Sequence, residues 1–436
     1  MSDPIRIGLL GAGVVGQGIL QLLHDQAPSI ERRLGTRIEV RRVVARDASK
    51  GRGEHLPDAL LSFDPNDVLD DAEIDIVVEV IGGVDPAGEY VRRALESGKS
   101  VVTANKALVA EEGHTLIELA EDKGVDLYFE AAVAGGIPVL RVLREALASD
   151  TVTRIRGIVN GTSNYILSRM RDAGLGFEEA LAEAQAEGYA EADPTLDVGG
   201  GDAAHKLTIL ATLAFGAQID PESVSVQGIE RVGAVDIAMA ARFGYVVKPL
   251  AVGLELADGS LDLRVHPALV PIESVLASIS GALNVVELEA TMLGPCLLSG
   301  KGAGALPTAM SVVSDIVDVA RNLVSGASGR VPQRAFRGEH LVTRRIAGPD
   351  AHRAPFYLRF SVLDRPGILA RIAGVLGAFD VSIEQMVQTG RAADGQPVQV
   401  VMITHEAREG NVRNALREIE TLTGMLEPAR ALRIEP

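Results

Sequence analysis

The sequence IRIGLLGAGVVGQGILQLL, residues 5–23, decides the fold of the first part of the chain. Its first six residues form an apolar run typical of a short buried strand, and the apolar spacing after residue 16 is typical of a helix. Between them stand three glycines with the spacing G-x-G-x-x-G. The first allows a tight turn, the second lets the backbone approach a phosphate group, and the third lets helix and strand pack closely.

This strand–loop–helix context predicts that a dinucleotide pyrophosphate binds at the N-terminus of the helix, where unpaired amides favour negative charge. The predicted binding loop consists of Gly11, Ala12, Gly13, Val14, Val15 and Gly16.

The second expected strand, residues 38–45, ends in Arg46-Asp47. A site that prefers NAD usually has an acidic side chain here for the ribose hydroxyls, whereas an arginine can bind the 2′-phosphate of NADP. The sequence therefore favours NADP, with NAD also possible, and makes Arg46 and Lys50 the candidate phosphate ligands. The alternative is that both side chains are solvated loop residues.

Strands and helices continue to alternate up to residue 129. Further strands are expected at 74–80, 100–103 and 125–129, with helices near 87–97 and 108–123. This alternation predicts a parallel sheet with right-handed crossovers, which binds ligands beyond the carboxyl ends of its strands. The candidate cofactor residues at those ends are Gly82, Thr103, Ala104 and Lys106. The alternative for Lys106 is a surface lysine at a helix start.

The segment GYAEADPTLDVGGGDAAHK, residues 188–206, places four acidic side chains ahead of a single lysine. Asp202 and Lys206 are four residues apart, so on a helix they lie on one face, one turn apart. Such a segment suits a small substrate with an ammonium group, which the carboxylates would bind, and a hydroxyl, whose proton the lysine would handle. The alternative is a capped surface helix with an ordinary ion pair.

Composition narrows the class of protein. A chain of 436 residues is expected to hold two or three domains. Its net charge of −17 argues against nucleic acid and anionic membranes as partners. Cys296 is the only cysteine, which excludes an intrachain disulfide and a cysteine-based metal site. With no bilayer-length apolar run and no signal-peptide pattern, the sequence predicts a cytoplasmic protein.

Several motifs together resemble homoserine dehydrogenase. They are GAGVVG at 11–16, TANK at 103–106, EAAVAGGIP at 130–138, GIVNGTSNYIL at 157–167, the acid-rich segment from residue 188, and GKGAGALPTA at 300–309. That family interconverts L-homoserine and L-aspartate 4-semialdehyde by hydride transfer with NAD or NADP, in threonine, methionine and isoleucine biosynthesis. Since no aspartate kinase segment precedes the dinucleotide-binding part, a monofunctional enzyme is expected.

The resemblance also implies roles for individual residues. Lys206 is implied as the acid or base on the substrate oxygen, with Lys106 beside it and the nicotinamide. Roles in binding or orienting the substrate are implied for Glu191, Asp197, Asp202, Tyr189, Thr162 and Gly161. A monovalent cation, typically sodium, is implied on the backbone carbonyls of Glu130, Val133, Gly135 and Ile137. A cofactor contact is implied for Gly302, in a loop where the family often has other residues in place of Lys301.

The chemistry of a lysine base depends on its surroundings. A free lysine titrates at about 10.4, too high for a base at neutral pH. A neighbouring ammonium group lowers such a pKa, whereas nearby acids raise it, so the sequence alone leaves the balance open. In the reductive direction a protonated lysine donates a proton to the developing alkoxide.

The last part of the chain, residues 356–436, has the predicted order strand–helix–strand–strand–helix–strand. This order and the turn DRPGIL, residues 364–369, resemble the ACT domain, which binds amino acids, often between paired copies. Attached to a homoserine dehydrogenase, it implies feedback inhibition by threonine. The alternative is a domain that only holds subunits together.

These expectations add up to an α/β protein with three domains. A Rossmann-type parallel sheet domain spans 1–130 with a return segment at about 305–335, an α+β domain for catalysis and oligomerisation spans 131–304, and a polar linker at 338–355 precedes the ACT domain at 356–436. The resemblance implies a homodimer or homotetramer through strands near 245–254 and 260–265.

Other functions stay open. An aspartate semialdehyde dehydrogenase needs an activated cysteine, but Cys296 lies in an apolar run. Another ACT-regulated dehydrogenase would carry a His–Glu pair and a cofactor motif in mid-chain. The non-enzymatic alternative is an amino-acid sensor that binds NADP without turnover, which an assay of homoserine-dependent NADPH formation separates from an enzyme.

Overall fold

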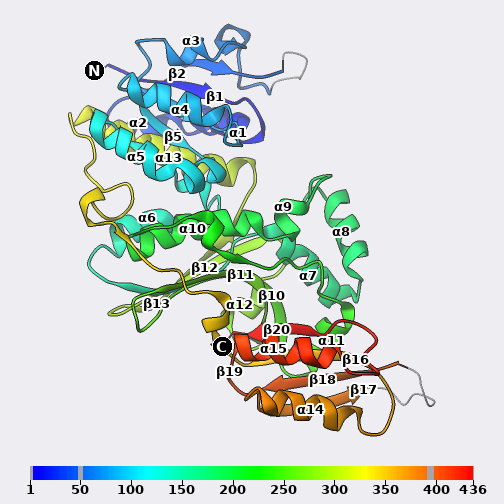
Figure 1. Ribbon diagram of the computed structural model, residues 1–436. Helices are drawn as coiled ribbons and strands as arrows, with labels where there is room; N and C mark the ends of the chain where they lie inside the picture. The colour runs from blue at the N-terminus through cyan, green and yellow to red at the C-terminus, as the bar shows by residue number, and fades with distance from the viewer. Residues whose placement is uncertain (1–2, 48–52, 390–396, 436) are drawn as a thin grey trace. The chain divides into compact units, whose positions relative to one another are not determined.

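The structure is a computed structural model, and it describes residues 3–47, 53–389 and 397–435. The chain, traced in Figure 1, divides into two compact units. The first consists of Met1–Gly161, Asp202–Val224 and Leu283–Arg344, and the second of Thr162–Gly201, Ser225–Ala282 and Arg345–Pro436. Neither unit is one continuous run of chain, so sequence order alone does not predict which elements share a core.

The first unit contains a six-stranded sheet in the order β3-β2-β1-β4-β5-β6, with all neighbouring strands parallel. The strands are β1 (Ile5–Leu10), β2 (Ile38–Val44), β3 (Leu61–Ser62), β4 (Ile76–Glu79), β5 (Ser100–Thr103) and β6 (Leu127–Tyr128). The helices between them are α1 (Val14–Asp25), α2 (Ala27–Leu34), α3 (Asn66–Leu69), α4 (Ala87–Glu96) and α5 (Lys106–Lys123). This order is that of doubly wound dinucleotide-binding folds, in which ligands bind where the strand order reverses.

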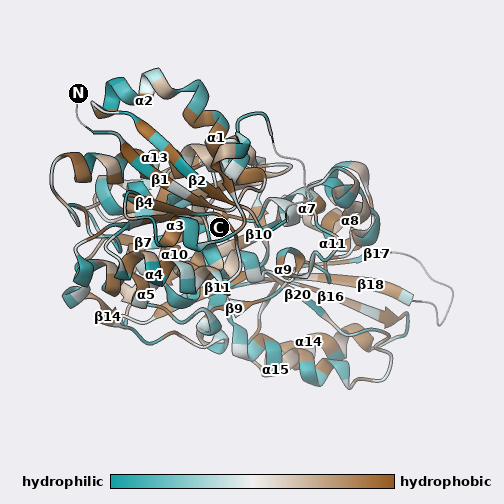
Figure 2. Ribbon diagram, turned by 90° about the horizontal axis from the view of Figure 1, so that it is seen from above, coloured by the Kyte–Doolittle hydropathy of each residue, from teal (hydrophilic) through white to brown (hydrophobic). Residues whose placement is uncertain are grey.

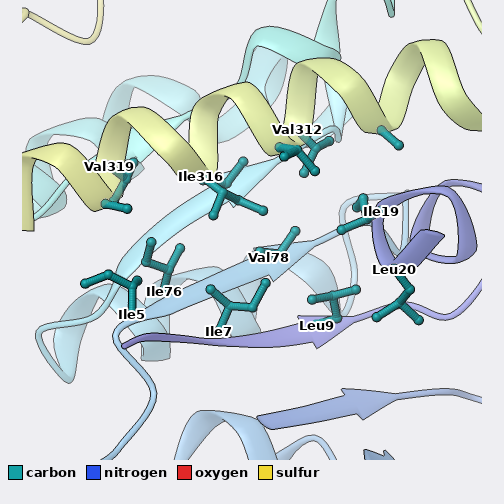
Figure 3. Close-up of a cluster of buried hydrophobic side chains, with 14 of the residues drawn as sticks. Ile5, Ile7, Leu9, Ile19, Leu20, Ile76, Val78, Val312, Ile316 and Val319 are labelled. Carbon is teal, nitrogen blue, oxygen red and sulfur yellow. The ribbon is translucent and has the colours of Figure 1, made fainter. Parts of the chain in front are cut away.

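One face of this sheet is covered by a helix from much later in the chain, α13 (Ala305–Val324). Figure 3 shows Val312 and Ile316 of α13 among the side chains of the sheet, such as Ile7 and Val78, and all four are fully buried. Residues four apart on a helix share one face, so this face of α13 completes the core. The strands of the sheet carry most of the hydrophobic colour in this part of Figure 2.

Helices α1 and α13 cross at a glycine. A Cβ atom added to Gly18 of α1 would lie 2.7 Å from the carbonyl oxygen of Ala305, the first residue of α13. That is closer than real Cβ atoms approach backbone, so the crossing requires glycine at this position.

The remainder of the first unit is built on three antiparallel strands. Strand β12 (Leu283–Ala290) pairs with both β7 (Val152–Ile158) and β13 (Gly294–Lys301). The other elements are α6 (Val139–Arg141), α10 (Gly201–Phe215), β8 (Ala217–Gln218) and β14 (Val342–Thr343), the last two of which pair in parallel. Most side chains of α10 are buried, so this is not a surface helix.

The second unit contains strands in the order β10-β11-β20-β16-β18-β17, with β9 also paired to β11. The strands are β9 (Ser225–Val226), β10 (Tyr245–Glu255), β11 (Leu261–Pro271), β16 (Phe356–Leu363), β17 (Ile383–Thr389), β18 (Pro397–Thr404) and β20 (Arg430–Ile434), with β15 (Arg353–Ala354) paired to β19 (Ala407–Arg408). The helices are α7 (Gly161–Ala173), α8 (Phe177–Ala186), α9 (Thr195–Val198), α11 (Ala234–Arg242), α12 (Val275–Ser278), α14 (Ile368–Ala378) and α15 (Glu409–Glu420). From β16 to β20 the main elements follow the expected βαββαβ order.

The predicted fold class is confirmed, and two local expectations need correction. The strand expected at 260–265 begins at Leu261 and extends to Pro271, and every residue from Leu261 to Val270 is buried. The stretch 338–355, expected as a linker, contains β14 and β15, two-residue strands too short to leave a periodic pattern.

Candidate active site

The glycine loop between β1 and α1 has the geometry that its spacing predicts. Gly11 has a φ of +120°, and a Cβ added there would lie 2.7 Å from the carbonyl oxygen of Val80. A Cβ on Gly16 would lie 2.2 Å from the carbonyl oxygen of Gly11. Around Gly13, by contrast, no atom lies within 4 Å of an added Cβ. The fold therefore requires the first and third glycines, and the open space at the second fits a pyrophosphate drawn up to the helix N-terminus.

A buried acid that the sequence analysis missed shapes the neighbouring strand ends. Glu79, the last residue of β4, is fully buried. Its carboxylate accepts hydrogen bonds from the backbone amides of Ile81 (2.7 Å) and Gly82 (3.2 Å) and from the hydroxyl of Thr103. Glu79 thus sets the position of two segments predicted to meet the cofactor. The signal that could have found it is an acid that ends an otherwise apolar strand, IVVE.

The second of these segments starts the helix that carries Lys106. Asn105 is the N-cap of α5, where its side chain accepts a hydrogen bond from the amide of Leu108 (3.2 Å), and its amide group donates to the carbonyl of Gly83 (2.6 Å). Lys106 is the first residue of that helix, so its backbone position is well determined.

Asp202 joins the two lysines that the sequence singled out. Its Oδ1 lies 2.9 Å from Nζ of Lys106, and its Oδ2 lies 2.7 Å from Nζ of Lys206. Oδ2 also accepts a hydrogen bond from the side chain of Asn160 at 2.8 Å. Asp202 is only 3% exposed, so this is not the ordinary surface pair of the alternative interpretation. The aspartate–lysine pair predicted on one helix face is present, and Lys106 is joined to it.

The surroundings keep Asp202 ionised. Burial opposes ionisation, but the ammonium groups of Lys206 and Lys106 and the amide of Asn160 outweigh it and hold the pKa of the Asp202 carboxyl well below its usual range. Lys206 also donates to the carbonyl of Val159 at 2.7 Å, and the side chain of Asn284 donates to the same oxygen at 3.1 Å. Lys206 is therefore tied both to its own helix and to the end of the segment that follows β7.

The two lysines that Asp202 joins line one cavity of about 270 Å³. Both lysines contribute to its wall, together with residues from the glycine loop, the two strand ends and the segment after β13. The predicted site residues among its lining are Val15, Gly82, Ala104, Lys106, Gly135, Lys206 and Gly302. A cavity with two ammonium groups beside the open carboxyl edge of a parallel sheet suits a nicotinamide ring and a small oxygen-bearing substrate.

Gly302 lies close to the bend that follows β6. A Cβ on Gly302 would lie 2.0 Å from Nδ2 of Asn284, and a Cβ on Gly135 would lie 2.5 Å from the carbonyl oxygen of Gly302. Glycine at 135 is therefore required for the close approach of the two backbones, and a side chain at 302 would displace the amide of Asn284. Arg46 is exposed immediately after β2, and Lys50 lies outside the described residues.

The four residues predicted to bind a cation through their carbonyls are all buried. The carbonyls of Glu130, Gly135 and Ile137 already accept hydrogen bonds, from Val133 N (3.4 Å), the Ser311 hydroxyl (2.6 Å) and Val139 N (2.8 Å). A carbonyl oxygen has two lone pairs, so these bonds leave room for a cation. Among the described residues no group of three His, Cys, Asp or Glu side chains could hold a metal ion, but that does not test a carbonyl site. The cation stays a prediction.

The remaining substrate candidates, apart from Gly161, lie in the second unit. The Thr162 hydroxyl donates to the carbonyl of Tyr189 at 2.7 Å, and the hydroxyl of Ser163 donates to the carbonyl of Asp197 at 3.0 Å. Glu191 is exposed, and its carbonyl accepts from the side chain of Gln185 at 3.0 Å. These bonds hold the acid-rich segment in place within that unit.

Three polar residues, Thr162, Ser163 and Asn164, stand near the start of helix α7. Helix α7 already begins at Gly161, so all three lie within its first turn. The side chain of Asn164 donates to the carbonyl of Gly281 at 2.9 Å. These side chains donate to carbonyls that are distant in the sequence, and local propensity does not reveal such partners.

A glycine loop of this geometry, next to a cavity with two lysines bridged by one carboxylate, defines a nicotinamide-dinucleotide-dependent dehydrogenase. Comparison with known proteins narrows the class. The family model for the homoserine dehydrogenase NAD binding domain matches residues 11–130, that for homoserine dehydrogenase matches 138–317, and that for the ACT domain matches 356–424.

Homoserine dehydrogenases from Neisseria gonorrhoeae and Pseudomonas aeruginosa are 43% and 42% identical to the chain, and each comparison covers 99% of both proteins. The crystal structure of a homoserine dehydrogenase from Thiobacillus denitrificans matches with a TM-score of 0.94 at 44% identity, over 99% of this chain and 98% of that one. The chain belongs to the homoserine dehydrogenase family, and its activity is that of this oxidoreductase. The ACT domain implies that it also binds a small-molecule effector.

A hyperthermophilic archaeal homoserine dehydrogenase in complex with NADPH matches with a TM-score of 0.62 at 27% identity, over 73% of this chain and 98% of that one. In the part of the chain that the structure describes, every helix is too short or too polar to cross a membrane.

Proposed function

We propose that Lys206 is the acid/base of the interconversion of L-homoserine and L-aspartate 4-semialdehyde, and that Asp202 and Lys106 position it. The observation that supports this assignment is the bridge of one buried carboxylate between two ammonium groups in the wall of a single cavity. The reaction transfers a hydride from the carbinol carbon to the nicotinamide, and the hydroxyl proton must leave at the same time.

The hydrogen bonds of Lys206 indicate how it meets the substrate. An ammonium group has three N–H donors. Two of them serve Asp202 Oδ2 and the carbonyl of Val159, and the described residues give the third no acceptor. That donor is available for the substrate oxygen. In the reductive direction it stabilises the developing alkoxide and gives up its proton, and in the oxidative direction the neutral amine accepts the proton of the hydroxyl.

Lys106 suits a supporting role better than Lys206 does. Its side chain is 37% exposed, compared with 12% for Lys206. A more buried amine, fixed by two hydrogen bonds, is held closer to one geometry, and proton transfer depends on that geometry. Lys106 adds positive charge near the developing alkoxide and fixes the other oxygen of Asp202.

We propose that the substrate ammonium is bound by carboxylates of the acid-rich segment. Glu191 and Asp197 supply the charge, while Tyr189, Thr162 and Gly161 shape the segment around it. The family match and the hydroxyl–carbonyl bonds of α7 support this proposal.

For the cofactor we propose NADP rather than NAD, since Arg46 follows β2 where an NAD site usually has an acid. The NADPH complex of the archaeal relative supports this preference. The loop residues from Gly11 to Gly16 hold the pyrophosphate, Thr103 and Ala104 flank the ring, and the bound cofactor supplies the hydride acceptor. We further propose that a monovalent cation, sodium as the resemblance implies, binds to the carbonyls of Glu130, Val133, Gly135 and Ile137.

At the level of the whole chain we propose the three-domain division of the sequence analysis, a homodimer or homotetramer, and a place in the cytoplasm. The contacts of α13 with the first sheet support a discontinuous dinucleotide-binding domain. We propose threonine as the effector of the ACT domain, which steady-state kinetics with and without threonine would test.

The central assignment is tested by Lys206→Ala. We expect kcat to fall by a factor of about 10² to 10⁴, the usual contribution of a general acid–base. The Kd for NADPH, measured by its fluorescence, should stay within a factor of about 2, because Lys206 takes no part in the pyrophosphate loop. Lys123→Ala, at the exposed end of α5, is the matched control and should keep full turnover. Undiminished turnover in Lys206→Ala would end the assignment.

A further inference from the structure

A second cavity of about 450 Å³ lies in the first unit, between α5 and α10. None of its lining residues belongs to the wall of the candidate active site. Apolar side chains make up much of its surface: Val109, Ile117, Phe129, Ile209, Leu213 and Ile219. Its volume lies in the range of sites for small organic ligands.

The most buried charged residue in the wall of this cavity is Arg334, which is 1% exposed. Its Nη1 donates to Nδ1 of His114 at 2.8 Å, and its Nη2 lies 2.9 Å from Glu121. Because a guanidinium only donates, Nδ1 of His114 must accept, and its proton sits on Nε2, 3.2 Å from Glu118. The buried Nε of Arg334 has no hydrogen-bond partner among the described residues. An unsatisfied buried donor is unfavourable, so an anionic oxygen brought into the cavity would be stabilised there.

The other charged groups of the cavity are acids near solvent. Glu111 and Asp220 both line it and are exposed. The cavity therefore has a buried guanidinium, which is paired with Glu121 but whose Nε donor has no partner in the part of the chain that the structure describes, carboxylates at the rim, and apolar walls between them. A zwitterion with an aliphatic side chain matches all three features, whereas a plain carboxylate or a plain amine leaves one end without a partner.

The two helices that form the cavity also carry the active-site charges. Lys106 begins α5 one turn before Val109, and Lys206 precedes Thr208 on α10. The 2.9 Å contact between Lys106 and Asp202 joins the same two helices. A ligand between them would bias their spacing and so the position of the lysine pair.

We propose that this cavity binds an α-amino acid with an aliphatic side chain, and that its occupancy changes turnover through the α5–α10 pair. The effect on turnover rests on the proposed roles of the two lysines, whereas the binding does not.

The test is thermal unfolding of the full chain with leucine, valine or isoleucine at about 10 mM, and with the des-amino and decarboxylated analogues of leucine. We expect an aliphatic amino acid to raise Tm by about 2 °C or more, and both analogues to have no effect. Thr212→Phe fills the cavity and should abolish the rise. Thr115→Phe, at an exposed position of α5 outside the cavity, is the control and should keep it.

Thr343→Trp changes an exposed position of the cavity wall and should also abolish the rise in Tm. It therefore tests binding even if Thr212→Phe does not fold. Binding is refuted if no aliphatic amino acid raises Tm, or if the rise persists in both variants. The coupling is tested separately: the amino acid that binds should change kcat at least about twofold in the parent and not in Thr343→Trp. An unchanged kcat at saturating ligand would overturn the coupling.

Discussion

Replacing Asp202 by asparagine tests whether one buried carboxylate organises the candidate active site. The carboxylate serves three donors: Oδ2 accepts from Lys206 and Asn160, and Oδ1 accepts from Lys106. Asparagine offers only one oxygen. It would keep that oxygen toward Lys206 and Asn160, because the flipped amide would turn its N–H groups against two donors. Lys106 would then face an amide N–H in place of a carboxylate oxygen.

The expected cost follows from the burial of these groups. Removing one partner of a buried ion pair costs about 3–5 kcal/mol, because the other charge stays behind uncompensated. The lower end applies here, since the half-exposed Lys106 can turn toward water. We therefore expect Asp202→Asn to lose about 3 kcal/mol of unfolding free energy at neutral pH. The loss of the negative charge beside Lys206 and of the contact that holds Lys106 should also lower kcat by a factor of about 10².

Urea unfolding and steady-state kinetics measure the two effects. The matched control is Asp193→Asn in the same segment, whose exposed carboxylate accepts hydrogen bonds from Thr195, and no measurable change is expected there. If Asp202→Asn unfolds within about 1 kcal/mol of the parent and turns over within a factor of about 3, the carboxylate does not organise the site.

Two further predictions concern the cofactor and pH. Arg46→Ala should raise the KM for NADP by about tenfold and change that for NAD little, since a charged hydrogen bond to the 2′-phosphate is lost; equal changes would count against the assignment. Burial and the neighbouring Asp315 raise the pKa of Glu130 to about 7, so the folded state keeps a proton that the unfolded chain releases near 4.5. This proton stabilises the fold fully below pH 4.5, and the stabilisation is lost as the pH rises toward 7, by up to about 1.4 kcal/mol per pH unit. In Glu130→Gln, the free energy of unfolding measured with urea should depend less on pH over this range.

Local sequence patterns correctly predicted the strands that are bounded by turn-forming residues. Strands β1 and β5 have the predicted ends, because glycine or asparagine stands close beyond them and stops the apolar run. The aspartate–lysine pair on α10 was predictable for a similar reason, since its spacing of four is a local property of a helix.

Contacts between distant segments could not be predicted in this way. The approach of Lys106 to Asp202 depends on how α5 and α10 pack, and no local pattern encodes that. Glu79 was missed because an acidic residue at a strand end usually indicates that the chain is leaving the core. Here its carboxylate is buried and accepts backbone hydrogen bonds. The partners of the polar side chains that begin α7 could not be predicted, because they lie far along the chain.

The dependence of the first sheet on α13 has a cost during synthesis. The apolar face that Val312 and Ile316 cover stays open until the ribosome has released the chain well past residue 324. At typical elongation rates that interval lasts on the order of tens of seconds. During most of its translation, the nascent chain therefore exposes an apolar surface of an incomplete nucleotide-binding fold. A message truncated before α13 would yield a product that aggregates or is bound by chaperones.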